Sequence, residues 1–329
     1  MKTVLGIGNA LVDVLIHPVE DTFLSGFKLE KGSMTLVDKE KADDVLSAVA
    51  SGDRQRSSGG SAANTIHGLA KLGAPVGYIG KIGGDEWGEF FRSYMGHHNI
   101  CATLFTGKQE SGKSIVLISK DCERTFATYL GAAIELGPAD LTPEPFQGYD
   151  YFHLEGYLVQ NHALVEAAVK LAKQTGIEIA IDLASYNVVK ANLDFLRKIT
   201  AEYIDIVFAN EEEAEAFTGK ADPEEALSVI AETSKIAVVK IGKEGSLIAR
   251  GDERYRISPI KAKAIDTTGA GDLYASGFFY GLINGHTLDI CGKIGSITSG
   301  KIVEVLGAKM DDSKWDEVFQ MVKEVTKKS

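Results

Sequence analysis

The sequence predicts an α/β protein in which helices cover both faces of a mostly parallel sheet and a small second sheet forms a lid. Apolar strands rich in isoleucine and valine, such as residues 177–183, 204–210 and 236–241, alternate with amphipathic segments of about 12–15 residues. Strands that are buried on both faces have such continuous apolar runs. Residues 15–38 and 102–130 break this rhythm and predict the lid. We expect residues 1–329 to form one domain with three α/β/α layers.

Composition and charge narrow the class of protein. The 329 residues are 44% hydrophobic and 25% charged, which is an ordinary balance for a globular chain. The net charge of −11 argues against a nucleic-acid partner, which needs a basic face. Cys101, Cys122 and Cys291 are far apart, as expected in a reducing compartment without a disulfide framework. Because no apolar run reaches membrane-spanning length, we expect a cytoplasmic protein without a membrane partner.

The chain begins with an apolar stretch, residues 4–16, that contains glycines and two polar residues. Gly6 and Gly8 start a dinucleotide-binding fingerprint, but Leu11 stands where the third glycine belongs. A nicotinamide-binding protein is therefore only an alternative. Asn9 and Asp13 are polar in an apolar setting, and such groups are by default hydrogen-bonded structural groups.

A glycine-rich turn precedes a predicted helix in residues 57–73. Gly59 and Gly60 lead into the helix, whose apolar residues face inward, and Gly73 ends it. Asn64 lies on the open face of this helix. Taken alone, the segment is a helix N-terminus with a polar surface residue.

Residues 107–114 match the letters of the phosphate-binding P-loop, but their context does not fit it. A P-loop lies between a strand and a helix, whereas residues 114–119 are β-branched and predict a strand. Residues 102–106 also predict a strand, so we expect a hairpin with a polar tip. The next strand carries Arg124, which by default is a surface charge on an edge strand.

Strand–loop–helix units continue through the second half of the chain. The strand of residues 149–158 ends near Tyr157, which either stacks on a ligand or fills the core. Asn210 and Glu213 follow the next strand, in an acidic first helical turn that also suits the helix dipole. In residues 236–248, two strands flank a glycine turn, and Lys240 there is by default an edge lysine that snorkels to solvent.

The most informative stretch runs from Ile265 to Gly277. Thr267 or Thr268 is expected to cap a helix that begins near Ala270. The glycines let the backbone approach another molecule closely, and the N–H groups of the first helical turn favour an anion. Asp272 then stands beside the anion as a general base that deprotonates a hydroxyl during its attack on phosphorus.

The motif Asp266-Thr267-Thr268-Gly269-Ala270-Gly271-Asp272 resembles the C-terminal signature of the ribokinase-like (PfkB) family of sugar and nucleoside kinases, and the likeness extends along nearly the whole chain. The resemblance implies a ribokinase-like fold. It implies a catalytic group made of Asp272, Gly269, Ala270, Gly271 and Arg124. It implies an acceptor site made of Asn9, Asp13, Gly59, Gly60, Asn64 and Tyr157. It implies an ATP site made of Asn210, Lys240, Gly242, Gly245, Thr268, Gly269, Gly271 and Ser299. It implies that Glu213 organises Mg²⁺ through water and that Asp266 holds K⁺.

These observations predict a kinase that transfers the γ-phosphoryl of ATP to a primary hydroxyl of a nucleoside or sugar. Asn9–Asp13, Arg124–Thr128 and Glu155–Tyr157 look most like the adenosine-kinase-related branch, so conversion of adenosine to AMP is the leading expectation. Ribose, fructose and related sugars are alternative acceptors. A nucleotide sensor without catalytic activity is the alternative from another class. The sequence allows a monomer or a homodimer.

Overall fold

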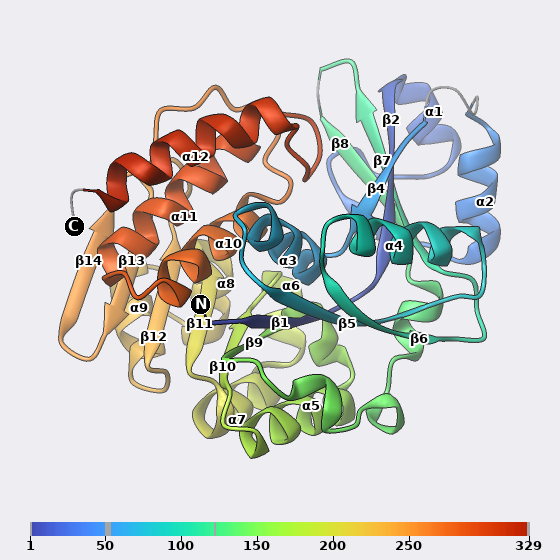
Figure 1. Ribbon diagram of the computed structural model, residues 1–329. Coiled ribbons are helices and arrows are strands. Elements are labelled where there is room, and N and C mark those ends of the chain that lie inside the picture. The colour runs from blue at the N-terminus through green and yellow to red at the C-terminus, as the bar shows by residue number, and fades with distance from the viewer. Residues whose placement is uncertain (1, 50–53, 122, 328–329) are drawn as a thin grey trace.

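The computed structural model describes residues 2–49, 54–121 and 123–327, and these form two sheets (Figure 1). In the described residues the large sheet has nine strands in the order β14-β13-β12-β11-β10-β9-β1-β5-β6. These are β1 (Val4–Ile7), β5 (Val76–Ile82), β6 (Cys101–Thr106), β9 (Tyr151–Glu155), β10 (Glu178–Asp182), β11 (Ile206–Asn210), β12 (Ile236–Lys240), β13 (Ser246–Arg250) and β14 (Glu253–Ile257). All neighbours pair in parallel except β12 with β13 and β13 with β14.

Helices cover the large sheet on both faces, as Figure 1 shows. Alternate residues of one strand belong to different cores: Leu5 packs with the cluster that contains α5 (His162–Gln174), whereas Val4 packs with the cluster that contains α10 (Ala270–Ile283). The helices are α1 (Asp21–Gly26), α2 (Lys39–Ser47), α3 (Ser61–Lys71), α4 (Glu86–His97), α5 (His162–Gln174), α6 (Tyr186–Ala191), α7 (Leu193–Tyr203), α8 (Glu211–Thr218), α9 (Pro223–Ala231), α10 (Ala270–Ile283), α11 (Leu288–Ile302) and α12 (Asp312–Thr326). The predicted fold class, a mostly parallel sheet between helical layers with a smaller sheet beside it, is confirmed.

Several helices begin where a short polar side chain caps their first turn. Asp85 accepts a hydrogen bond from Gly88 N–H at the start of α4, and Asn161 accepts one from Leu164 N–H at the start of α5. Asp222 and Asp311 cap α9 and α12 in the same way. Each cap satisfies an N–H group that the helix itself leaves unpaired, which stabilises the helix by roughly 1 kcal/mol.

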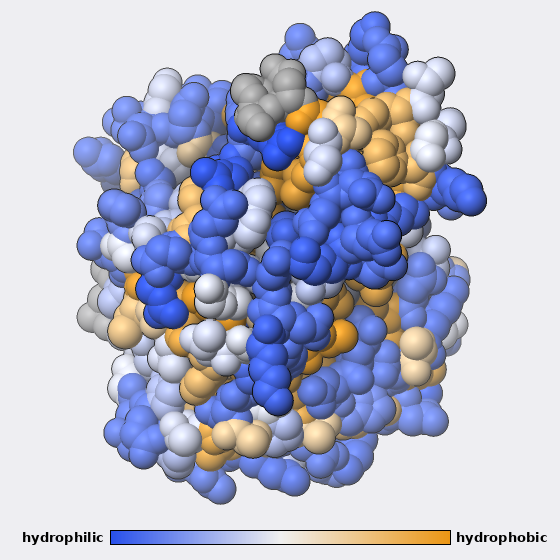
Figure 2. Space-filling view, turned by 90° about the vertical axis from the view of Figure 1, so that its right-hand side faces the viewer, coloured by the Kyte–Doolittle hydropathy of each residue, from blue (hydrophilic) through white to orange (hydrophobic). Residues whose placement is uncertain are grey.

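The small sheet has the order β3-β8-β7-β2-β4 in the described residues. Its strands are β2 (Leu11–Val19), β3 (Met34–Leu36), β4 (Arg54–Gly59), β7 (Gly112–Ser119) and β8 (Arg124–Tyr129). Figure 2 views the molecule from the side that carries this sheet and α2, and shows a mostly hydrophilic surface with hydrophobic side chains gathered near its upper edge. Within the described ranges, every helix is too short or too polar to cross a membrane.

The predicted bounds of the small sheet need three corrections. Residues 102–106 belong to β6, which pairs with β5 in the large sheet, so the expected hairpin of 102–119 is wrong. Residues 21–26 form α1 within a segment that we expected to contain only strands. The strand β4 was missed because its sequence, Arg-Gln-Arg-Ser-Ser-Gly, is polar, as edge strands often are.

Two nucleotide-binding motifs in the sequence do not form their characteristic structures. Gly112–Ser119 is a strand, so residues 107–114 do not form a P-loop, as predicted. The turn after β1 leads into strand β2, whereas a dinucleotide fingerprint requires a helix there. Gly8 has another role, because a Cβ at this position would lie 2.3 Å from the Glu155 carboxylate. The nicotinamide-binding alternative therefore has no structural basis at this turn.

Candidate active site

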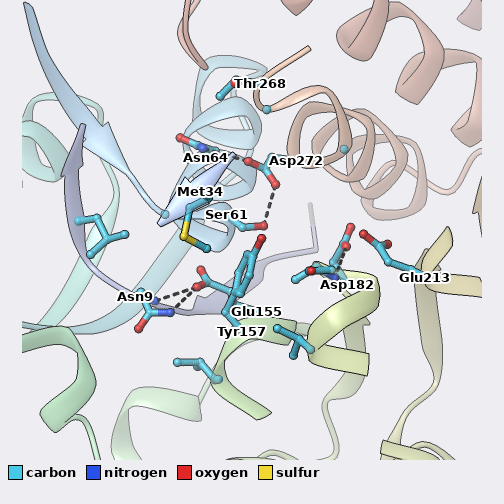
Figure 3. Close-up of a pocket in the computed structure, with 18 of the residues that line it drawn as sticks. Asn9, Met34, Ser61, Asn64, Glu155, Tyr157, Asp182, Glu213, Thr268 and Asp272 are labelled. Atoms are coloured by element: carbon cyan, nitrogen blue, oxygen red, sulfur yellow. Dashed lines mark hydrogen bonds between the residues drawn. The ribbon is translucent and has the colours of Figure 1, made fainter. Parts of the chain in front are cut away.

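A cavity of about 1390 Å³ lies between the two sheets. Four residues of its lining, Glu155, Asp182, Asn210 and Lys240, are the last residues of β9, β10, β11 and β12. The cavity thus lies at the carboxyl ends of parallel strands, where open α/β sheets bind their ligands. Figure 3 shows the side chains that converge there.

Asp272 lies in the first turn of α10 and faces the cavity (Figure 3). Ser61 Oγ donates to its Oδ1 at 2.7 Å, and Asn64 Nδ2 donates to its Oδ2 at 2.9 Å. Burial raises the pKa of Asp272 to about 6, against the lowering effect of these two hydrogen bonds. The carboxylate is therefore held by two donors from α3 and ionised at neutral pH, which a general base requires.

The backbone before Asp272 forms a tight turn at the start of α10. Gly269 is the N-cap, with φ +72°, and a Cβ there would lie 2.8 Å from the Cβ of Ala308. The expectation that Thr267 or Thr268 caps the helix is therefore wrong. Ala270 N–H donates to the Thr267 carbonyl at 3.2 Å.

The remaining amides of the turn lie open to an anion. The N–H groups of Gly269, Gly271 and Asp272 have no acceptor among the residues that the structure describes. A Cβ at Gly271 would lie 3.1 Å from Lys240 Nζ, so a cationic side chain is next to these amides. Unpaired N–H groups at a helix start together with an ammonium group form a site for a phosphate.

Arg124 reaches this turn from the small sheet. Its guanidinium forms an ion pair with Asp266 and donates to Thr268 Oγ1. Asp266 also accepts hydrogen bonds from Thr268 N–H, at 2.7 Å, and from Gly307 N–H. This carboxylate is buried and already bonded to three donors, one of them a full positive charge, so this arrangement does not fit K⁺ at Asp266.

Five of the six predicted acceptor residues line the other half of the cavity: Asn9, Asp13, Gly60, Asn64 and Tyr157. The buried Glu155 binds one of them there. Asn9 Nδ2 donates to Glu155 Oε1 at 2.7 Å (Figure 3), and Ala62 N–H donates to Glu155 Oε2 at 3.0 Å. Burial raises the pKa of Glu155 to about 7. Glu155 was named only as part of the segment Glu155–Tyr157 and was given no role, although its position at the end of a buried strand was a usable signal.

Gly59 and Gly60 make room for their neighbours, which explains why both positions are glycine. A Cβ at Gly59 would lie 1.9 Å from Asp13 Oδ1, and a Cβ at Gly60, which has φ +94°, would lie 2.1 Å from the Asn9 carbonyl oxygen. Burial raises the pKa of Asp13 to about 7, and nearby Asp272 adds to this effect, while Lys309 opposes it.

Tyr157 belongs to the short 3₁₀ helix Gly156–Gln160 and lines the same half of the cavity. Its ring stands beside Glu155 in Figure 3. Burial raises the pKa of its phenol well above the usual value, so the hydroxyl stays protonated. Of the two sequence-based alternatives, the structure favours contact with the cavity.

The opposite half contains the residues predicted to bind ATP. Lys240 Nζ donates to Asp182 Oδ2 at 2.8 Å, so this lysine is an ion-paired group of the cavity rather than the expected edge lysine. Gly242, Gly245 and Ser299 also line this half. Gly245 has φ +100°, and a Cβ there would lie 1.9 Å from the Ile257 carbonyl oxygen. Asp182, the last residue of β10, was not among the residues predicted to bind ATP.

Asn210 and Glu213 form a capping box at the start of α8. Asn210 Oδ1 accepts from Glu213 N–H, and Glu213 accepts from both Asn210 N–H and Asn210 Nδ2, each at 2.8 Å. Burial raises the pKa of Glu213 to about 7. Among the described residues, no group of three acidic, histidine or cysteine side chains is arranged to hold a metal. The Glu213 carboxylate, which lines the cavity, fits an Mg²⁺ ion that keeps its waters and is held mainly by phosphates.

Comparisons with known proteins agree with this geometry. Residues 33–315 match the model of the pfkB family of carbohydrate kinases. A probable sugar kinase from Rhizobium etli CFN 42 is 33% identical, with a TM-score of 0.88 over 97% of this chain and 98% of that one. An adenosine kinase from Sinorhizobium meliloti is also 33% identical, with a TM-score of 0.87 over 97% and 99%.

A curated relative has a different name. The 5-dehydro-2-deoxygluconokinase of Clostridium perfringens is 30% identical over 283 residues, which are 80% of this chain and 83% of that protein. The chain therefore belongs to the pfkB family of carbohydrate kinases and is a phosphotransferase that acts on a hydroxyl group.

Proposed function

We propose that this protein transfers the γ-phosphoryl of ATP to a primary hydroxyl of a neutral nucleoside, with adenosine converted to AMP as the best candidate reaction. The charge of the cavity is the observation that carries this proposal. Seven carboxylates and one lysine are among the described residues that line it. The acids are Asp13, Glu155, Asp182, Glu211, Glu212, Glu213 and Asp272, and the lysine is Lys240.

This charge pattern disfavours an anionic acceptor. A gluconate derivative, as in the name of the Clostridium relative, carries a carboxylate that calls for a cationic partner. The only cation of the described lining, Lys240, lies in the half that we assign to ATP and is already paired with Asp182. A neutral nucleoside or sugar avoids repulsion by Asp13 and Glu155.

The apolar part of the lining favours a nucleoside over a small sugar. Met34 and Leu36 of β3 and Ile134 in the 3₁₀ helix Gly131–Glu135 line the cavity, and 48%, 53% and 61% of their surfaces are exposed. Phe126 and Leu130 lie in the same lining. A planar base covers such side chains, whereas ribose or fructose alone does not. The adenosine kinase of S. meliloti, at 33% identity, supports this choice.

The residues support a direct transfer. The acceptor hydroxyl gives its proton to an Asp272 carboxylate oxygen while its own oxygen bonds to the γ-phosphorus, and the bond from that phosphorus to the β–γ bridging oxygen of ATP breaks. The amides of Gly269, Gly271 and Asp272, with Lys240 beside them, stabilise negative charge on the transferred group. Mg²⁺ neutralises phosphate charge when bound, and Glu213 is its candidate partner through water. We include no K⁺, because Asp266 does not fit it.

We also infer the setting in which the enzyme works. Among the described residues, Cys101 and Cys291 are free thiols. Free thiols are typical of a reducing compartment, which supports the cytoplasm as the place where the enzyme works. The small sheet is proposed to act as a lid that keeps water from the phosphoryl group. The chain is a monomer or a homodimer in this proposal.

The acceptor is tested by measuring ADP release with adenosine, inosine, ribose, fructose and 5-dehydro-2-deoxygluconate. We expect turnover with adenosine to exceed that with each sugar. Turnover on a sugar with none on the nucleosides would overturn the nucleoside assignment while leaving a kinase. A folded protein that binds ATP yet releases no ADP with any acceptor would instead support the nucleotide sensor.

The base is tested by Asp272→Asn, which keeps the size of the side chain. We expect turnover to fall by about 10²–10⁴-fold while ATP binding persists, because only the proton acceptor is lost. In the wild type, turnover should decrease below about pH 6, where Asp272 becomes protonated. Turnover of the variant within a few-fold of the wild type would show that another group takes the proton.

A further inference from the structure

Lys309, which no motif singled out, lies behind the acceptor half of the site. It follows α11 in the chain, and its Nζ donates to Asn64 Oδ1 at 2.7 Å. The same Nζ is 5.7 Å from the centre of the Tyr94 ring. No carboxylate of the described residues comes within ion-pair distance of it. A partly buried ammonium without a direct counter-ion is costly, so a role that compensates for its position is to be expected.

The contact with Lys309 determines how the Asn64 amide is oriented. An ammonium group only donates hydrogen bonds, so it must face the amide oxygen. The amide nitrogen then faces Asp272 Oδ2, to which it donates at 2.9 Å. The flipped amide would place N–H groups against an ammonium and an oxygen against a carboxylate. Lys309, Asn64 and Asp272 therefore form one directional hydrogen-bonded chain that ends on the proposed base.

The charge of Lys309 also acts on two carboxylates of the cavity. Asp13 and Asp272 repel each other across the acceptor site, and the positive charge of Lys309 favours the ionised form of Asp13. In turn, burial lowers the pKa of Lys309 to about 8, and both carboxylates oppose that lowering. Lys309 is thus the positive member of a group of three charges.

Other titratable groups near this cluster do not replace that charge. Burial lowers the pKa of His67 and of His98, so both are neutral at pH 7, and burial raises the pKa of Tyr94 to about 12. Lys71 interacts with the two histidines, and its Nζ pairs with Asp312 at 2.8 Å. On the other side of Asp272, Lys240 is paired with Asp182, and Glu155 adds negative charge.

We propose that Lys309 is a positioning residue of the acceptor site, which orients the Asn64 amide toward Asp272 and balances the charges of Asp13 and Asp272. This proposal rests on the proposed function, since it assigns Lys309 a role in the same site. Lys309 acts through Asn64 and through its own positive charge, without contact with the reacting atoms.

The test compares Lys309→Met, which removes the charge and the donor, with Lys309→Arg, which keeps both. Lys71→Met is the matched control, because it removes a nearby cation that does not contact Asn64. We expect the acid limb of the kcat/KM profile of Lys309→Met to move up by about one pH unit. Relative to the wild type, the kcat/KM of Lys309→Met should then be lowest at pH 6 and below, and it should approach the wild-type value near pH 9. Lys309→Arg and Lys71→Met should keep the wild-type limb.

A Lys309→Met variant whose profile overlays that of Lys71→Met, with only a lower Tm, would overturn the proposal and leave Lys309 a purely structural residue. A wild-type protein that phosphorylates no acceptor would refute the proposed function by itself. Lys309 would then be tested by melting alone. Because its pKa in the folded state is lowered, wild-type stability should rise between about pH 8 and 10, and Lys309→Met should lose that rise. Equal melting profiles would refute the charge cluster.

Discussion

At the scale of single residues, several glycines of the site are explained by the carboxylates that they make room for. Gly8 leaves space for Glu155, and Gly59 leaves space for Asp13. Gly8, one of the two glycines that first suggested a dinucleotide fingerprint, is therefore part of acceptor-site packing, whereas a Cβ at Gly6 would meet the core residues Ile66 and Tyr78. A glycine is required wherever another backbone or a buried carboxylate comes this close.

Gly59→Ala tests this interpretation. The added Cβ would lie 1.9 Å from Asp13 Oδ1, so the carboxylate or strand β4 must move. We expect KM for the acceptor to rise at least tenfold, with a smaller change in KM for ATP, when both are measured by steady-state kinetics. Gly96→Ala is the matched control, because a Cβ there meets nothing within 4 Å on an α4 surface. Equal effects of the two variants would contradict the role of Gly59.

At the scale of elements, the site depends on groups that join strand ends to helix starts. Glu155, at the end of β9, binds Asn9 after β1 and the first turn of α3. Its pKa is raised to about 7 from an ordinary 4.5, so the folded protein binds this proton more tightly than the unfolded chain. The stability that results is present below about pH 4.5 and is lost as the pH rises through 7.

Glu155→Gln removes this titration and keeps the shape of the side chain. We expect the decrease in Tm of the wild type between pH 5 and pH 8 to become smaller in the variant, because the pH dependence of its free energy of unfolding loses a contribution on the order of 3 kcal/mol or less. Some decrease should persist, because Asp13 and Glu213 also have pKa values raised to about 7. Melting curves of the wild type, the variant and the surface control Glu202→Gln across this range provide the measurement. Parallel curves for Glu155→Gln and the wild type would argue against the assignment.

At the scale of the whole molecule, one arginine joins the small sheet to the turn before α10, the proposed anion site. Arg124 of β8 binds Asp266 and Thr268 in the turn that leads to Asp272. The contact links the position of the small sheet to that of the backbone proposed to bind phosphate. Since Arg124 is buried and charged, its loss leaves the Asp266 carboxylate without its ion-pair partner.

Arg124→Met tests whether this link holds the small sheet in place. We expect turnover to fall about 10–100-fold, the amount that a charge-assisted hydrogen bond supplies. Amide exchange in β8 and β3 should become faster, and more ADP should be released per acceptor phosphorylated because water enters. Arg56→Met serves as the control, because Arg56 lies on β4 of the same sheet but is exposed and faces Trp87. Unchanged exchange and unchanged coupling in Arg124→Met would refute the link.

The sequence was sufficient for the fold class and for most strands of the large sheet, but not for β6. Strands such as Ile236–Lys240 and helices such as α10 follow from local hydrophobic pattern and glycine placement, which need no distant partner. The predicted turn before Asp272 and the base beside it rest on the same local information. The sheet to which a strand belongs could not be predicted from local sequence, because β6 and β7 are adjacent in the chain yet belong to different sheets.

What the sequence by itself determined is therefore the fold class and the family motif, and it was enough to propose Asp272 as the base, because each depends on residues close together in the chain. The tertiary structure decided which side chains meet across long separations: Glu155 with Asn9, Arg124 with Asp266, and Lys309 with Asn64. Contacts between residues more than a hundred positions apart leave no periodicity in a single sequence. Only folding brings these charges into one cavity, where burial and mutual repulsion shift their pKa values.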